Sequence, residues 1–159
     1  MVELVVVIVL AGFLMALGAP AFSAWQKKHA VEDQIEKLHS NLQLARMNAH
    51  TQKVIWGLWW GAPGSASFNA YQIRKDNSNP LNGSISDAGD ANPDFNVALK
   101  FPVLSSVDSG AVAFDGRGIT TNGTILSIAP SFGASLDCIA VSMARTRVGK
   151  MKGGACAPK

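Results

Sequence analysis

The residues Glu3–Phe22, ELVVVIVLAGFLMALGAPAF, decide the fold of this chain. From Leu4 to Phe22 the sequence runs for 19 residues without a charged side chain. As a helix this run is about 28 Å long, close to the roughly 30 Å hydrocarbon core of a bilayer. The stretch therefore predicts a transmembrane helix. Trp25, Lys27 and Lys28 follow it as the aromatic and cationic boundary typical of a membrane surface.

A cleaved secretory signal is the alternative interpretation of the same run. Ala19-Pro20-Ala21 is similar to the small-residue site at which such signals are cut. No lysine or arginine precedes the apolar run, however, and the only early charge is Glu3, which has the wrong sign for a signal peptide. We therefore favour a retained helix, which Pro20 and the nearby Gly18 are predicted to kink or locally melt.

The segment that follows, residues 25–53, is amphipathic rather than wholly apolar. Apolar residues recur there at spacings of four and three, at Val31, Ile35, Leu38, Leu42, Ala45 and Ala49. The opposite face carries charged and polar side chains. This pattern predicts that the helix continues and that its apolar stripe docks on the core of a domain.

After Thr51 the helical period ends, and the sequence is typical of strands and turns. The expected strands are Val54–Trp60, Ser67–Arg74, Phe95–Val103, Ala111–Asp115, Ile119–Thr121, Thr124–Ile128 and Cys138–Met143. Asn122-Gly123 predicts a tight hairpin between the fifth and sixth of these. The expected fold is α+β, with a transmembrane half-helix over 1–24, an amphipathic half-helix over 25–53 and a small antiparallel sheet domain over 54–159.

Length, charge and cysteine content narrow the function classes. A chain of 159 residues and 16.7 kDa fits one domain, which argues against a multidomain enzyme. Seven acids and two bases lie between Asp76 and Asp137, whereas five bases and no acid follow from Cys138 onward, so the C-terminal end suggests an anionic partner. Cys138 and Cys156 lack zinc-type spacing and predict a disulfide in an oxidising compartment.

Residue patterns typical of catalysis do not occur in the sequence. There is no GxSxG, Walker or dinucleotide-binding motif. His29, His39 and His50 are too far apart on a helix to share a metal ion, and we expect them at the surface. Trp56, Trp59 and Trp60 could stack a ligand, but aromatic residues at a helix-to-sheet junction favour a core role. The sequence thus predicts no enzyme activity, no cofactor and no small-molecule substrate.

The segment Asp76–Asn96 is rich in turn-forming residues. Its oxygen ligands Asp87, Asp90, Asn92 and Asp94 allow a calcium-binding interpretation. Their spacing does not match an EF-hand loop, and aspartate and asparagine favour turns through local hydrogen bonds alone. We expect an exposed loop without a metal site.

Three short stretches resemble a known class of proteins. Val2–Ala11 (VELVVVIVLA), with Pro20 seventeen residues after Glu3, resembles the start of type IV pilins and type II secretion pseudopilins. Leu42–Ala49 (LQLARMNA) and Phe114–Gly123 (FDGRGITTNG) are similar to motifs of the GspH/FimT group of that class. The resemblance implies a pilin-like fold and a structural role in a type IV pilus or a type II secretion pseudopilus.

The same resemblance implies where the chain resides and what it contacts. It implies a single-pass inner-membrane protein with a periplasmic C-terminal domain, which becomes part of an extracellular pilus or a periplasmic pseudopilus and has other subunits as partners. Glu3 and Pro20 are then assembly residues, Glu3 by pairing with the terminal amine of a neighbour. Members of the class lose a basic leader before an N-methylated residue. Compared with that pattern the chain begins late, so neither feature is assigned to a residue here.

The stretch Met143–Val148, MARTRV, resembles the segment by which FimT-type competence pilins contact DNA, with Ala144 in place of a glycine. Clustered bases bind phosphate, so four residues are candidates for DNA contact: Arg145, Arg147, Lys150 and Lys152. Their alternation with other residues predicts that several share one face of a terminal strand or loop. A DNA-binding minor pilin for DNA uptake in natural transformation is therefore the alternative function.

Overall fold

The computed structural model describes residues 2–78, 81–90, 95–120 and 122–159, without the side chains at positions 11 and 13–21. Its elements are α1 (Val2–Gln52), β1 (Trp56–Trp59), β2 (Ser67–Lys75), the 3-10 helix η1 (Ala88–Asp90), β3 (Asn96–Ser105), β4 (Ala111–Phe114), β5 (Thr124–Ile128), β6 (Cys138–Val141), β7 (Thr146–Lys152) and β8 (Ala155–Pro158). The strands form an antiparallel sheet in the order β4-β1-β2-β3-β5-β6-β7-β8. The predicted class, α+β with a long helix on an antiparallel sheet, is confirmed.

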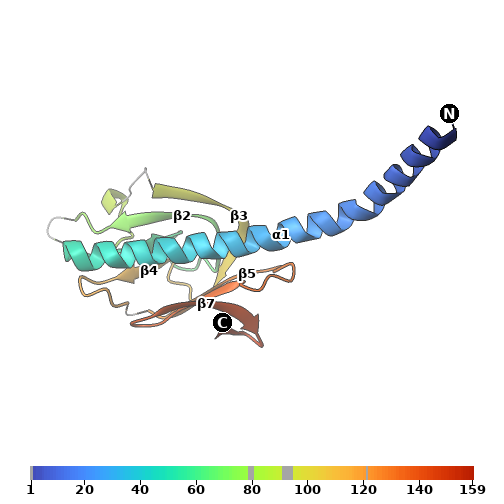
Figure 1. Cartoon of the computed structure of the whole chain (residues 1–159). Helices are drawn as coiled ribbons and strands as arrows, with labels where there is room; N and C mark the ends of the chain where they lie inside the picture. The colour runs from blue at the N-terminus through green and yellow to red at the C-terminus, as the bar shows by residue number, and fades with distance from the viewer. Residues whose placement is uncertain (1, 79–80, 91–94, 121) are drawn as a thin grey trace.

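The C-terminal half of α1 lies along one face of the sheet, and the N-terminal half extends beyond the domain (Figure 1). The predicted stripe faces the core, since Val31, Ile35, Leu38, Leu42, Ala45 and Ala49 are all fully buried. They pack in one cluster with sheet residues such as Leu58, Val112, Phe114, Leu126 and Ile139. Burial of each large aliphatic side chain contributes about 1.5 to 3 kcal/mol, so this stripe fixes the domain to the helix.

The predicted membrane segment can be compared with the helix only in part. Within the described residues, no helix is long and apolar enough to cross a membrane. The expected span from Leu4 to Phe22 includes positions 11 and 13–21, whose side chains lie outside the described residues, and so do Gly18 and Pro20 of the predicted kink. The helical backbone is assigned without a break from Val2 to Gln52, and Figure 1 shows α1 curved between the domain and its N-terminus.

The hairpin predicted at Asn122-Gly123 is wrong. Both edges of β5 are already paired, since Val103 of β3 lies opposite Ile128 and Val141 of β6 lies opposite Thr124. Ile119 and Thr120 are in no strand, Thr121 lies outside the described residues, and Gly123 lacks the positive φ that such a turn requires. A local turn signal was thus overridden by pairing with strands that are distant in the sequence.

The loop after β2 is less exposed than predicted. The side chains of Asp76, Ile85 and Asp90 are buried, and both carboxylates accept backbone hydrogen bonds within the loop. Asp76 accepts from Ser78 at 3.0 Å and from Gly83 at 2.8 Å, whereas Asp90 accepts from Asn77 at 2.9 Å and from Asp87 at 3.1 Å. These acids therefore organise the loop instead of facing solvent.

The chain ends in a hairpin of β7 and β8 that is folded back on the sheet. Gly153 and Gly154, with φ of 56° and 84°, form its turn. Cys138 of β6 and Cys156 of β8 form a disulfide with a Cα–Cα distance of 5.9 Å, although β7 lies between these strands and two strand spacings amount to about 9.5 Å. The fold-back needs Gly149, because a Cβ there would lie 2.1 Å from the Ala157 carbonyl oxygen.

Candidate functional site

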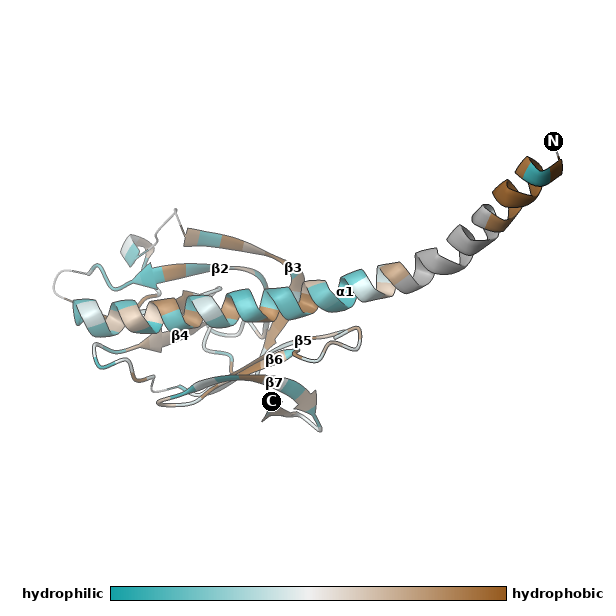
Figure 2. Ribbon diagram, viewed as in Figure 1, coloured by the Kyte–Doolittle hydropathy of each residue, from teal (hydrophilic) through white to brown (hydrophobic). Residues whose placement is uncertain are grey.

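The N-terminal segment of α1 is an exposed apolar helix. Val2 and the residues from Leu4 to Leu10 have relative exposures of 50 to 77%. Figure 2 shows this end of the helix as strongly hydrophobic, in contrast to the mixed surface of the half that lies on the sheet. Glu3 is exposed in the first turn, within the apolar surface. A contiguous apolar surface of this kind marks a contact with protein or lipid.

Gln34 joins α1 to an irregular part of β3. Ala98 of β3 pairs with Ala70 and Val103 pairs with Phe68, so residues 99–102 form a bulge without partners in β2. The Gln34 side chain is 8% exposed; its Oε1 accepts from the backbone of Lys100 at 3.0 Å and of Phe101 at 2.9 Å. Its Nε2 donates to the Phe101 carbonyl at 2.7 Å. Gln34 thus takes the place of a missing strand partner.

Sequence reasoning missed Gln34 as a site residue. The available signal was its position directly before the stripe residue Ile35, at the border of the apolar face. A long amide there can reach from the helix to a strand backbone, but only the bulge in β3 creates the need for it.

A second polar contact ties α1 to the loop after β5. The Glu32 carboxylate accepts from the Ser135 backbone at 2.7 Å and lies 3.3 Å from the His29 ring. The hydrogen bond from Ser135 lowers the pKa of Glu32; Lys28 and His29 add to this effect, while partial desolvation opposes it. The loop is therefore held against the helix shortly after the helix leaves the apolar segment.

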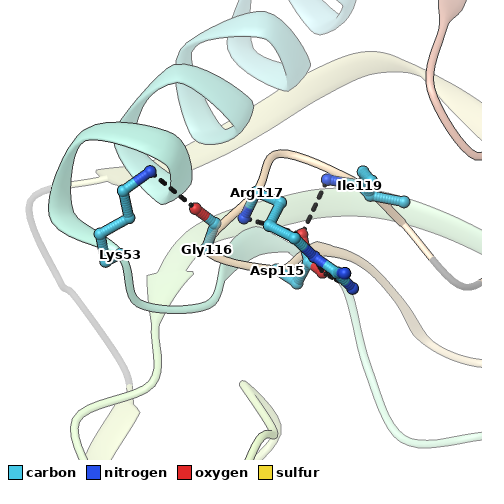
Figure 3. Close-up of polar contacts among 5 residues, drawn as sticks. All are labelled: Lys53, Asp115, Gly116, Arg117 and Ile119. Atoms are coloured by element: carbon cyan, nitrogen blue, oxygen red, sulfur yellow. Dashed lines mark hydrogen bonds and ion pairs between the residues drawn. The ribbon is translucent and has the colours of Figure 1, made fainter.

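The turn after β4 closes the other end of the domain (Figure 3). Asp115 accepts hydrogen bonds from the backbone amides of Arg117 and Ile119, each at 2.9 Å, and its carboxylate pairs with the Arg117 guanidinium at 2.8 Å. These hydrogen bonds, the one from Ile119 first, lower the pKa of Asp115. Lys53, which ends the helix with φ of 57°, donates to the Gly116 carbonyl at 3.4 Å. The stretch around Gly116 therefore forms a tight turn beside the C-terminal end of the helix.

The four candidate DNA-contacting bases lie on the terminal hairpin and the turn before it. Arg145, Arg147, Lys150 and Lys152 are all exposed, and in the described part of the chain none of them forms an ion pair. Side chains alternate along β7, so Arg147 lies on one face with the disulfide, whereas Lys150 and Lys152 lie on the other. Arg145 and Arg147 line one shallow pocket with Ser142. The four bases, several of which were predicted to share one face, thus lie as two separate pairs.

The tryptophans that the sequence singled out lie in the hydrophobic core or at its border. Trp56 and Trp60 are buried, and Trp60 stacks on Phe68 at 4.6 Å, while the Arg74 guanidinium lies 3.5 Å from the ring of Trp59. The tryptophans are therefore part of the core and its border, as predicted.

The described residues give little support for metal binding. They include no group of histidine, cysteine and acidic side chains placed to hold a metal ion. Asp87 accepts from Asn82, and Asp90 is used by its own loop. Asn92 and Asp94 lie outside the described residues.

A helix with an exposed apolar end, whose second half is buried against an antiparallel sheet, defines the class of pilin-like proteins. The family model of the type II transport protein GspH matches residues 34–145, and the chain belongs to this family. The match covers α1 from Gln34 onward and the strands β1–β6, and it ends at Arg145. Glu3, Pro20 and Cys156 lie outside it, and so do the bases from Arg147 onward.

Solved structures support the same fold. Two crystal forms of the type IV minor pilin FimU from Pseudomonas aeruginosa match with a TM-score of 0.54 and 16% sequence identity. The matches cover 75% and 79% of this chain and 92% of FimU in both cases. No curated protein sequence gives a match.

Proposed function

We propose that the chain is a minor pilin or pseudopilin, a structural subunit of a type IV pilus or a type II secretion pseudopilus that catalyses nothing. The observation that carries the proposal is the exposed apolar segment from Val2 to Leu10, which protrudes from a domain whose own core is complete. Before assembly this segment lies in the inner membrane with the sheet domain in the periplasm. In the filament it packs against the same segment of neighbouring subunits.

Glu3 favours the assembled filament over storage in the membrane. A carboxylate at the bilayer centre costs about 2.5 to 3.5 kcal/mol on insertion scales, and less near the edge. Membrane storage needs no charge at this position, so the carboxylate favours a state in which a cation pairs with it. The terminal amine of a neighbouring subunit is the cation that the pilin resemblance implies. Such pairing makes the filament more favourable than the membrane for the same apolar helix.

The test compares Glu3→Gln with Glu36→Gln, which removes an exposed carboxylate from the docked half of α1. We expect both variants to remain in the membrane fraction, and only Glu3→Gln to lose incorporation into filaments. If the pairing of Glu3 contributes about 1.4 kcal/mol or more to assembly, the incorporated fraction of Glu3→Gln falls at least about tenfold. Equal incorporation of Glu3→Gln and the unchanged chain would refute the role of Glu3.

DNA binding is the second candidate function, and one observation favours it. Four exposed bases lie close together on the terminal hairpin and have no ion-pair partner in the described part of the chain. Arg147, with Arg145 beside it in the preceding turn, lies on the opposite face of β7 from Lys150 and Lys152, so a straight duplex contacts one pair at a time. We therefore expect weak binding in which log K falls with log salt at a slope of about −2, rather than the −4 of a single basic face.

Matched double variants test the DNA function. Arg145→Gln/Arg147→Gln and Lys150→Gln/Lys152→Gln each remove two charges from one face. We expect one of them to lower the affinity of the full chain for duplex DNA at low salt, and the other to have little effect. No binding by the unchanged chain, or equal affinity in all three proteins, would leave the structural role alone.

A further inference from the structure

We infer that the place where α1 leaves the domain carries a binding surface for anionic lipid headgroups, formed by the helix and the sheet domain together. This exit surface consists of Trp25 and Lys27 of α1, Lys100 and Phe101 of β3, and Phe132 in the loop after β5. The inference rests on the proposed function, because it applies to the subunit while it is stored in the membrane.

The exit surface brings together aromatic rings and amines from three segments. Phe132 is 39% exposed, and the Lys27 amine lies 5.6 Å from the centre of its ring. The Phe132 and Phe101 rings are 5.5 Å apart, and the Lys100 amine lies 5.8 Å from the Phe101 ring. Aromatic rings that alternate with lysines are typical of the membrane–water interface, where the rings lie among headgroups and the amines contact phosphate.

The helix side of the surface has the same composition. Phe22 and Trp25 have exposures of 59% and 55%, and their rings stack at 5.9 Å. In the described residues, the ring contact of Trp25 beyond Phe22 is with His29, one turn later on the same helix. The sheet domain thus does not bury these two large rings, and exposed rings of this kind mark a contact with protein or lipid.

The depth of Trp25 and Lys27 is close to that of the headgroup layer, which is about 5 to 7 Å thick on each side of the hydrocarbon core. If Phe22 marks the end of the membrane span, Trp25 lies about 4.5 Å and Lys27 about 7.5 Å further along the helix. Phe132 is next to Lys27, so it lies at the outer edge of the same layer. Figure 1 shows the loop after β5 at the end of the domain from which α1 extends.

The loop that carries Phe132 is attached to α1 through Ser135. Ser131 accepts from the Ala134 amide at 2.9 Å, Ala134 is buried, and Ser135 donates to Glu32. Phe132 itself has φ of 49°, a conformation that bulky residues rarely adopt. The fold therefore holds an aromatic ring outward at this position at a cost to the backbone.

The charge of the surface selects anionic lipid. Lys27, Lys28 and Lys100 lie around it, while the nearby Glu32 carboxylate is occupied by Ser135 and His29. Asp33 is the exposed acid next to Glu32 on α1, so the local balance remains positive. Each lysine close to an anionic leaflet favours the docked form about fivefold.

The experiment measures amide hydrogen exchange of the full chain in nanodiscs of phosphatidylcholine, alone or mixed with phosphatidylglycerol. We expect the Gly133 amide to exchange more slowly in the anionic discs, by about fivefold for each lysine that contacts the leaflet. Lys27→Gln/Lys100→Gln should remove the difference between the two lipids. The control Lys53→Gln/Lys75→Gln removes the same charge at the opposite end of the domain, where Lys53 contacts Gly116 and Lys75 pairs with Trp56, and should retain the difference. Phe132→Asn, which keeps access to positive φ, should lessen the slowing.

The outcomes separate this inference from the proposed function. Flotation of the full chain with vesicles is measured in parallel. Failure of the chain to float would refute membrane storage and this inference with it. Flotation with the same Gly133 exchange in both lipids, or with the same response to the two lysine pairs, would overturn the inference alone. Slowing that follows the number of copies per disc and not the lipid charge would also overturn it, because a neighbouring copy would then cover the surface.

Discussion

Gln34→Ala is the sharpest test of how the helix holds the sheet. The substitution removes three hydrogen bonds at 2.7 to 3.0 Å, from two β3 amides and to one β3 carbonyl. Each such bond contributes about 0.5 to 1.5 kcal/mol net, and an orphaned buried group costs about 1 to 3 kcal/mol. Lys100 is exposed, so in the variant water can bind its amide and offset part of the cost of the lost hydrogen bond. Phe101 is half-buried, so most of the cost at its backbone groups remains. We expect a loss of about 2 kcal/mol in the free energy of unfolding.

The assay is urea unfolding of the full chain in detergent, followed by the fluorescence of its tryptophans, among which Trp56 and Trp60 are buried in the domain. With an m-value of about 2 kcal/mol/M, the midpoint should fall by about 1 M. Gln52→Ala, at the exposed end of α1, is the matched control and should shift the midpoint little. A shift for Gln34→Ala no larger than that of the control would refute the argument that this side chain replaces a strand partner.

Three further predictions concern the turns and the terminal hairpin. Cys138→Ser/Cys156→Ser should lower the free energy of unfolding by about 3 kcal/mol in the chain-entropy model, and an unchanged urea midpoint would contradict this. Gly149→Ala places a methyl group 2.1 Å from the Ala157 oxygen and should keep β8 from folding back far enough for Cys156 to reach Cys138. Thiol labelling of the unreduced, denatured chain should then detect free cysteines, and complete disulfide formation would contradict this. Asp115 has a lowered pKa, so its stabilising effect is present above the unfolded value of about 3.9 and is lost as pH falls through the folded pKa. Asp115→Asn should therefore flatten the acid side of the stability profile, and parallel profiles would count against this.

The sequence predicted those features that depend on local periodicity. Val31 and the later stripe residues repeat with the helical period, and all of them are buried, because one apolar face can be satisfied only by the core. The strands from Trp56 to Val141 were placed within a few residues for the same kind of reason. The alternation along β7 was read only as placing several bases on one face, whereas Arg147 lies on one face of the strand and Lys150 and Lys152 lie on the other.

Two of the features that were mispredicted or missed, the turn at Asn122-Gly123 and the role of Gln34, depend on contacts with other strands, whereas the burial of Asp76 and Asp90 arises within one loop. Asn122-Gly123 has the composition of a tight turn, yet β5 takes its partners from β3 and β6. Asp76 and Asp90 are polar and were placed in solvent, but the amides of their own loop draw them inward. Gln34 has a role only because β3 bulges opposite it, and no pattern within α1 indicates that bulge.

The two outer strands of the sheet have a consequence for the specificity of polymerisation. β4 and β8 are each four residues long, and β8 ends at Pro158, which has no N–H to offer a further strand. The disulfide and Gly149 also fold β8 back, away from the plane in which another sheet would join. Short or bent edge strands of this kind resist edge-to-edge aggregation. For the proposed filament subunit, which polymerises by its helix, these edges protect against a second, unwanted polymerisation through the sheet.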